Sequence, residues 1–352
     1  MFSERLKQLI PYTAGEQPRD MKYLKLNTNE NPYPPSLKIE EFLKSCDIER
    51  LRLYPDPLAN GLRCALAKRY KVEEENIFVG NGSDEVLSFV FYAFFDDKNG
   101  PLLFPQFTYS FYPVYCGFYM IQYEKIPLAQ DFSININDYL NKPSCGIILA
   151  NPNAPTGCYI NLEQIKQLIE NYQKDRVIVI DEAYIDFGGE SAIKLINDYN
   201  NLLIIRTFSK GMSLAGIRLG FAIGNKELID ALFTVKDSFN SYPVDMLTQK
   251  IGEIAICDEE YYKIINTKII ETRQYFSGEL IKAGWEVLPS KANFIFVRKK
   301  GLSGKNIYLK LKERGILVRY FDIEGIKDFV RITIGRQEDM EYLLKEMNNS
   351  FL

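Results

Sequence analysis

Short apolar runs alternate with helical segments between about residues 75 and 225, and this pattern constrains the fold most. The runs are rich in β-branched residues, and each ends in a polar, glycine- or proline-containing cluster: Asn76–Val79, Leu102–Pro105, Gly146–Ala150, Arg176–Ile180 and Leu202–Ile205. Buried strands that alternate with helices predict a mostly parallel sheet with helices on both faces. Such sheets bind ligands outside the carboxyl ends of their strands, so the polar clusters are candidate site residues.

The cluster after Leu202–Ile205 contains a candidate catalytic lysine. Lys210 lies in the stretch RTFSKGMSLAGIRLG, beside Ser209 and eight positions before Arg218. A lysine amine whose pKa is lowered condenses with a carbonyl, such as the aldehyde of pyridoxal phosphate (PLP). A hydroxyl and a guanidinium suit a phosphate group. Taken alone, the stretch is equally compatible with an ordinary surface lysine.

A glycine turn leads from one strand into the following helix. It reads Gly80-Asn81-Gly82-Ser83-Asp84-Glu85. The free N–H groups and the dipole at a helix N-terminus favour a phosphate. The carboxylate of Asp84 is unfavourable there, so we expect the backbone to make the contact. An ordinary strand-to-helix turn is the alternative.

Three other strand ends carry side chains that suit a pyridine ring. Asp181 and Tyr184, in DEAY, are placed to hold a ring nitrogen protonated and to bond a phenolic oxygen. Phe107 is placed to stack on a planar ring, and the loop 151–157 (NPNAPTG) presents amide groups. A helix-capping aspartate and an aromatic core cluster are the alternatives.

Composition excludes several classes of site. The chain has no histidine, so Ser-His-Asp and Cys-His sites and histidine-ligated metals are excluded, and we expect no metal. A net charge of −3 gives no electrostatic footprint for nucleic acid. No apolar run reaches membrane-span length, and the start lacks the apolar core of a signal peptide. Six scattered cysteines without a CxxC pair predict reduced thiols in a cytoplasmic protein.

The pattern predicts two domains and an N-terminal arm. We expect a helix and arm over residues 1–25, packed with the small domain. Residues 26–250 then form the large domain that binds the cofactor, and residues 251–352 form a small α/β domain. A long helical region is expected from residue 224 to about residue 280, and the boundary near residue 250 lies inside it.

In this order, GNGSDE, NPNAPTG, DEAY and TFSK with its distant arginine resemble the motifs of the fold type I PLP-dependent aminotransferases. LNTNENPYPPS, YPDP and the paired GILVR and VRITIG are most similar to the histidinol-phosphate aminotransferase branch. The resemblance covers nearly the whole chain. It implies PLP as cofactor and transfer of an amino group from glutamate to imidazole-acetol phosphate.

The resemblance also implies residue roles. Lys210 would carry the cofactor and move a proton, and Asp181 and Tyr184 would contact the ring. Phe107 would stack on the ring. The phosphate would be held by Ser209, Arg218 and the backbone at Gly82, Ser83 and Asp84. Tyr54 would reach the PLP phosphate of a neighbouring subunit, which implies a homodimer with shared sites, and the substrate would meet Tyr12, Asn29, Arg319 and Arg331.

One departure concerns the ring oxygen. The family usually reads NPNNPTG, and Ala154 stands where the asparagine that bonds this oxygen is expected. Asn153 is our candidate replacement, while Asn151 or Tyr184 alone are the alternatives. Related reactions that share these motifs also stay open: transamination of aromatic amino acids or of another phosphorylated amine, and decarboxylation of a phospho-amino acid. We do not expect a PLP-sensing transcription regulator, which would carry an N-terminal DNA-binding domain, because about 25 residues precede the first motif and the net charge is −3.

Overall fold

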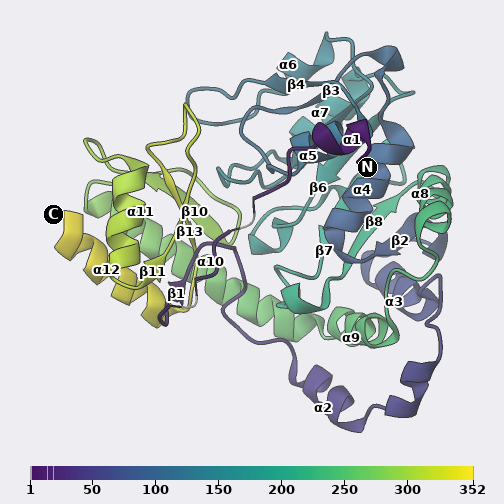
Figure 1. The fold of residues 1–352 in the computed structure, drawn as a ribbon, viewed down its shortest axis with the longest axis horizontal. Helices are drawn as coiled ribbons and strands as arrows, with labels where there is room; N and C mark the ends of the chain where they lie inside the picture. The colour runs from purple at the N-terminus through teal and green to yellow at the C-terminus, as the bar shows by residue number, and fades with distance from the viewer. Residues whose placement is uncertain (1, 14, 19, 352) are drawn as a thin grey trace.

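A seven-stranded sheet forms the centre of the fold (Figure 1). The computed structural model describes residues 2–13, 15–18 and 20–351. In spatial order the strands are β2 (Ile77–Gly80), β8 (Gly220–Gly224), β7 (Leu202–Thr207), β6 (Val177–Asp181), β5 (Gly146–Ala150), β3 (Leu102–Pro105) and β4 (Tyr123–Ile126). Only β8 runs antiparallel to its neighbours, which confirms the mostly parallel sheet predicted from the sequence.

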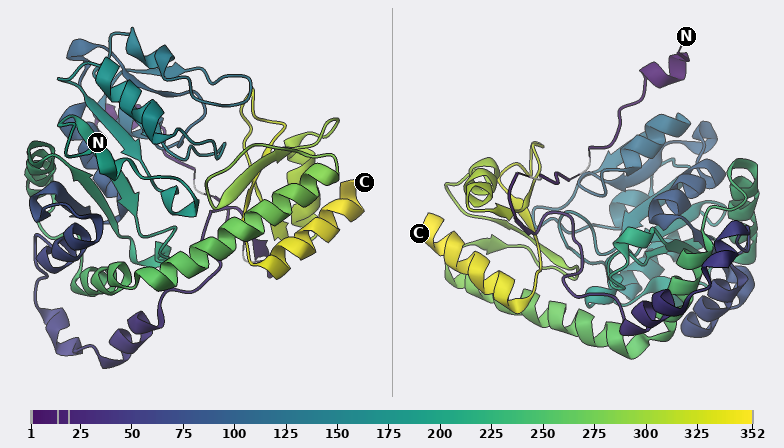
Figure 2. Two further views of the ribbon diagram at one scale, coloured as in Figure 1. Left: turned by 180° about the vertical axis from the view of Figure 1, so that it is seen from behind. Right: turned by 60° about the horizontal axis from the view of Figure 1, so that its bottom comes forward.

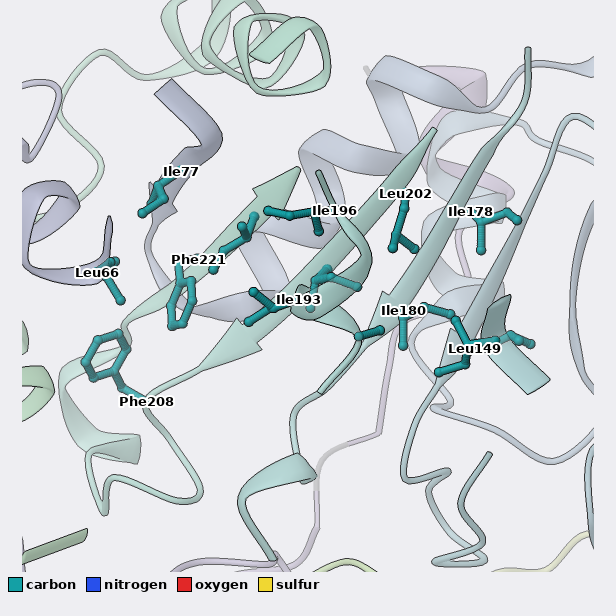
Figure 3. Packing of buried hydrophobic residues seen from close by; sticks show 14 of the residues in the cluster. Leu66, Ile77, Leu149, Ile178, Ile180, Ile193, Ile196, Leu202, Phe208 and Phe221 are labelled. Atoms are coloured by element: carbon teal, nitrogen blue, oxygen red, sulfur yellow. The ribbon is translucent and has the colours of Figure 1, made fainter. Parts of the chain in front are cut away.

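Helices cover both faces of this sheet. Successive side chains of a strand point to opposite faces, so Ile178 and Ile180 of β6 join one core and Val179 joins the other. The helices of the first core are α3 (Asn60–Tyr70), α7 (Leu162–Asn171) and α9 (Met246–Cys257). Figure 3 shows Ile178 and Ile180 in this core, with Leu149 and Leu202 of the neighbouring strands. The helices of the second core are α4 (Gly82–Phe94), α5 (Tyr112–Tyr119) and α8 (Lys226–Phe239). Each large aliphatic side chain buried there contributes about 1.5–3 kcal/mol.

The long helical region predicted after residue 224 consists of three separate helices. α8 ends at Phe239, α9 begins at Met246, and α10 runs over Glu259–Lys282. Pro243 cannot continue a helix because it lacks a backbone N–H. The Asp245 side chain then caps α9 by accepting a hydrogen bond from the N–H of Thr248. Local capping chemistry therefore overrides the apolar pattern here.

The C-terminal part has its own sheet and core. Its four-stranded antiparallel sheet has the order β12 (Arg319–Tyr320), β13 (Val330–Thr333), β10 (Phe294–Arg298) and β9 (Glu286–Val287). Helices α10, α11 (Gly304–Glu313) and α12 (Gln337–Phe351) pack on it around residues such as Phe276. α10 also sends Ile265 into the first core, so the chain passes from one core to the other within a helix. The predicted domain limits stay predictions.

The N-terminal residues lie along the C-terminal part and then leave it. β1 (Leu24–Lys25) pairs with β11 (Ile316–Leu317). The amphipathic helix predicted near the start is only α1 (Glu4–Lys7), which buries no residue and stands away from the body (Figure 2). Ala14 of the predicted arm lies outside the described residues. α2 (Leu37–Ser45) and the 3₁₀ helix Ile48–Arg52 form an excursion at the edge of the molecule (Figure 1). None of the described helices has the length and apolarity to span a bilayer.

Candidate active site

A cavity of about 300 Å³ lies where the central strands end. The register pairs Ala150 with Asp181, so the ends of β5 and β6 share one edge. Most of the predicted site residues line this cavity: Lys210, Asp181, Tyr184, Ser83, Asp84, Ser209, Arg218, Tyr12, Asn29, Arg319 and Arg331. Gly82, Phe107, Asn153 and Tyr54 do not.

Lys210 enters the cavity from the loop that follows β7. Its Nζ donates a hydrogen bond to the carbonyl oxygen of Thr28 at 3.1 Å. It also lies 5.7 Å from the centre of the Tyr184 ring. The Asn31 side chain donates to the Lys210 carbonyl oxygen at 3.2 Å, which fixes the backbone of the loop. The amine therefore faces the cavity from a restrained backbone.

Asp181 is the last residue of β6 and is 4% exposed. Its carboxylate accepts hydrogen bonds from the Tyr112 hydroxyl at 2.8 Å and the Ala183 N–H at 3.1 Å. Burial raises the pKa of Asp181 to about 6, although both hydrogen bonds favour the ionised form and oppose the rise. A cation in the cavity would complete the pairing of this carboxylate.

Tyr184 and Asn29 are joined to the C-terminal sheet. Asn29 Nδ2 donates to the Tyr184 hydroxyl at 3.0 Å, and Asn29 Oδ1 accepts from the Thr333 hydroxyl at 3.0 Å. The Asn293 side chain donates to the carbonyl oxygen of Asn29 at 2.9 Å. Asn29 thus lines the cavity, as predicted for a substrate contact, but its side chain already has protein partners.

A phosphate-sized cradle lies at the start of α4. A Cβ on Gly220 would lie 2.3 Å from the Ser83 nitrogen, so only glycine lets β8 pass this close to the helix start. Arg218 bonds Asp84 at 3.0 Å and lies 3.5 Å from the Ser209 hydroxyl. Gly82, beneath the guanidinium, has a positive φ of 81° and lies beside the cavity lining.

These groups fit PLP at three points. The N-terminus of α4, Ser209 and Arg218 offer donors to a phosphate, the buried Asp181 offers a carboxylate to a ring nitrogen, and Lys210 offers an amine to an aldehyde. Asp84 is the counter-argument, because its carboxylate already pairs with Arg218. That pair is roughly half exposed, so it is worth little and an anion can compete for the guanidinium.

The two C-terminal arginines line the opposite side of the cavity. Arg331 Nη2 donates to the Asn27 carbonyl oxygen at 3.1 Å, and burial lowers the pKa of Arg331. Its Nε is buried and has no hydrogen-bond partner among the described residues. Arg319 donates to the carbonyl oxygen of Thr13. Tyr12 packs on Phe111 at 4.8 Å, which brings the N-terminal arm to the cavity.

Phe107, which we predicted to stack on the ring, does not line the cavity. Its ring packs toward Phe132 and against Gly325, outside the cavity lining. Tyr109, two residues on, lines the cavity instead and donates to Asp84 at 2.8 Å. In an irregular turn, the path of the backbone decides whether Phe107 or Tyr109 points into the cavity.

Asn153 does not reach the cavity, contrary to our expectation. Its Nδ2 donates to the Phe107 carbonyl oxygen and the Thr156 hydroxyl, and its Oδ1 is buried without a described partner. Asn151 is likewise occupied, by Ile160. Of the three candidates for the ring oxygen, Asn153, Asn151 and Tyr184, only Tyr184 lines the cavity. Ala154, which replaces the usual asparagine, also lines it.

Tyr54 lies away from the cavity of its own chain. Its side chain is 83% exposed and stacks on Tyr242 with ring centres 4.8 Å apart. Tyr112 and Tyr109 are the site residues that sequence reasoning missed. The signal was present in TYSFY, which directly follows a strand end, but aromatic residues are too common in this chain to mark it.

A buried ion network lies behind the lysine loop. Arg206 of β7 contacts the carboxylates of Asp186 at 2.5 Å and Glu182 at 3.5 Å. Burial alone would lower the pKa of Arg206, but these carboxylates raise it. A Cβ on Gly211 would lie 2.4 Å from Asp186, so the network touches the residue after Lys210. It joins the segment of Asp181 to the lysine loop.

Comparisons with known protein families, sequences and structures all match this chain to aminotransferases. The model of class I and II aminotransferases matches residues 21–347. The histidinol-phosphate aminotransferase of Syntrophus aciditrophicus is 62% identical over 354 aligned positions, covering 100% of this chain and 98% of that protein. The crystal structure of the histidinol-phosphate aminotransferase from Clostridium acetobutylicum has a TM-score of 0.86 at 26% identity and covers 93% of this chain and 98% of that one. The enzyme from Sinorhizobium meliloti, in complex with pyridoxal-5'-phosphate, shares the fold, with a TM-score of 0.86, 21% identity, and coverage of 98% and 95%.

Proposed function

Because the chain belongs to the class I and II aminotransferases, we propose that it is a PLP-dependent transaminase of histidine biosynthesis. It would move an amino group from glutamate to imidazole-acetol phosphate and so form histidinol phosphate. The assignment of the substrate rests on the 62% identity to a histidinol-phosphate aminotransferase over the whole chain. The cavity supports it, because it places an amine, a buried carboxylate and a phosphate cradle together.

The roles of the residues follow from their positions. Bound PLP supplies an aldehyde and an electron-withdrawing pyridinium ring. Asp181 would hold the proton on the ring nitrogen, and Tyr184 would bond the ring oxygen. Lys210 would carry the cofactor and move a proton at the substrate Cα. Ser209, Arg218 and the first N–H groups of α4 would hold the phosphate.

The substrate would lie between the sheet edge and the two C-terminal arginines. Arg331 has a buried Nε without a described partner, so a substrate oxygen is the acceptor that its position suits. Arg319 and Tyr12 would complete the anion-binding side. Two guanidinium groups suit a site that receives carboxylates from glutamate in one half-reaction and a phosphate in the other.

We further infer a cytoplasmic homodimer. The excursion between residues 37 and 58 exposes large apolar side chains, among them Leu37, Ile48 and Leu53, and such a surface is typical of an interface. Tyr54 at its end is exposed and lies outside its own cavity. A two-fold dimer would bring it to the PLP phosphate of the second copy and give two identical shared sites. The six cysteines, all among the described residues, form no disulfide with one another, as in proteins of a reducing compartment.

Single-turnover spectroscopy tests the substrate. The PLP-loaded protein is mixed separately with histidinol phosphate, glutamate, phenylalanine and a phospho-amino acid, and the visible absorbance of the bound cofactor is followed. Rapid loss of this absorbance with histidinol phosphate and glutamate, and slow loss with phenylalanine, is expected. Release of CO₂ from the phospho-amino acid would contradict the proposal in favour of a decarboxylase. Lys210→Ala is the matched control that should respond to none.

A further inference from the structure

A buried lysine holds the turn that carries Tyr54. Lys236 of α8 is 1% exposed. Its Nζ donates to the carbonyl oxygens of Pro57 at 3.1 Å and Ser241 at 3.2 Å, and pairs with Asp237 at 2.8 Å. The ammonium is therefore held by two carbonyl oxygens and one carboxylate. A buried ammonium is costly unless it is paired in this way, so its position is strictly defined.

A second buried side chain holds the same turn from α9. Gln249 is 9% exposed, and its Nε2 donates to the carbonyl oxygens of Asp56 at 2.8 Å and Val244 at 2.9 Å. Tyr242, which lies between α8 and α9, stacks on the Tyr54 ring. The turn is thus fixed at three points, although the Tyr54 side chain itself is exposed.

We propose that Lys236, assisted by Gln249, is a positioning residue for the cavity of the second subunit. It would fix the turn so that the Tyr54 hydroxyl reaches the PLP phosphate across the interface. This inference rests on the proposed shared-site dimer. Tyr54 does not line the active-site cavity of its own chain, so a lesion at Lys236 that acts through Tyr54 must appear in the partner's site. A lysine that only stabilised its own fold would act in its own subunit.

The first measurement is the release of PLP from the loaded dimer. Lys236→Met removes the ammonium and keeps a chain of similar length. We expect roughly tenfold faster release, because an ill-placed Tyr54 loses a hydrogen bond to a charged group. Tyr54→Phe should release PLP about as fast as Lys236→Met, because both variants lose the same hydrogen bond. A Lys236→Met dimer that retains PLP like the unsubstituted protein would overturn the proposal.

The second measurement mixes variant subunits after mild dissociation. Lys236→Met subunits are combined with Lys210→Ala subunits. The hybrid has one site with an intact Lys210 from the first subunit and a correctly held Tyr54 from the second. The expected result is rescue: one site of each hybrid is active and releases PLP as slowly as a site of the unsubstituted dimer.

Two further mixtures separate this inference from the proposed dimer. Tyr54→Ala should also be rescued by Lys210→Ala, whereas Asp181→Asn should not, because Asp181 and Lys210 line one cavity. Rescue of Tyr54→Ala without rescue of Lys236→Met refutes the positioning role and leaves the shared site standing. Failure of both, with hybrids detected, refutes both. If Lys236→Met does not fold, Gln249→Leu must give the same rescue pattern.

Discussion

The hydroxyl of Tyr112 sets the pH range in which the apoenzyme binds PLP. Burial raises the pKa of Asp181 to about 6, and the Tyr112 hydrogen bond opposes this rise. PLP binding with a protonated ring nitrogen favours the ionised carboxylate. Asp181 therefore has a lower pKa when PLP is bound than in the apoenzyme. Affinity should fall as the pH drops below about 6 and be independent of Asp181 above it.

Tyr112→Phe should move this fall to higher pH. A hydrogen bond to a charged group is worth about 1.5–3 kcal/mol, and about 1.4 kcal/mol corresponds to one pKa unit. Losing the bond therefore raises the Asp181 pKa by roughly one to two units. At pH 6.5 the variant should bind PLP about three- to twenty-fivefold more weakly than the unsubstituted protein, since most of its carboxyl is protonated. At pH 8.5 the two affinities should nearly coincide.

Equilibrium titration of the apoenzymes with PLP, followed by visible absorbance, measures this difference. The ionisation of PLP itself is common to both proteins, so it cancels in the ratio of affinities. Tyr115→Phe is the matched control: it removes a hydroxyl from the same helix, one that bonds the backbone oxygen of Asp84 at 2.7 Å. An affinity ratio for Tyr112→Phe that does not change with pH would refute the reasoning.

Three other substitutions test the cavity and its support. Lys210→Ala should retain PLP through the phosphate cradle but lose transamination; turnover without an added amine would exclude Lys210 from its role. Gly220→Ala should displace the start of α4, since its Cβ would lie 2.3 Å from the Ser83 nitrogen. We expect the free energy of unfolding to fall by about 1–3 kcal/mol and PLP binding to weaken. An unchanged denaturation midpoint would contradict this. Arg206→Met removes the cation that pairs with the buried carboxylate of Glu182 and the partly buried one of Asp186. It should destabilise the protein by about 3–5 kcal/mol, and an unchanged melting temperature would refute the network's contribution.

The residues of the sheet edge could be predicted because their positions follow from topology. The carboxyl ends of β5, β6 and β7 meet at one edge once the sheet is parallel. Asp181 and Lys210 could therefore be expected to lie close together from sequence alone. Phe107 could not be placed in this way, because it lies in a turn whose path is set by packing against the C-terminal part. Strand periodicity carries no information about such a turn.

The residues on the substrate side of the cavity could not be placed from sequence patterns either. Tyr12, Asn29 and Arg331 come from three distant segments, and no strand pattern in the sequence relates them. They meet because β1 pairs with β11, and because the C-terminal sheet holds Asn29 through Thr333. Both contacts join residues about 300 positions apart. The residues on the cofactor side can thus be predicted because each follows a strand of one mostly parallel sheet. The substrate side depends on docking of separate parts, so its residues could be expected only through resemblance to a family.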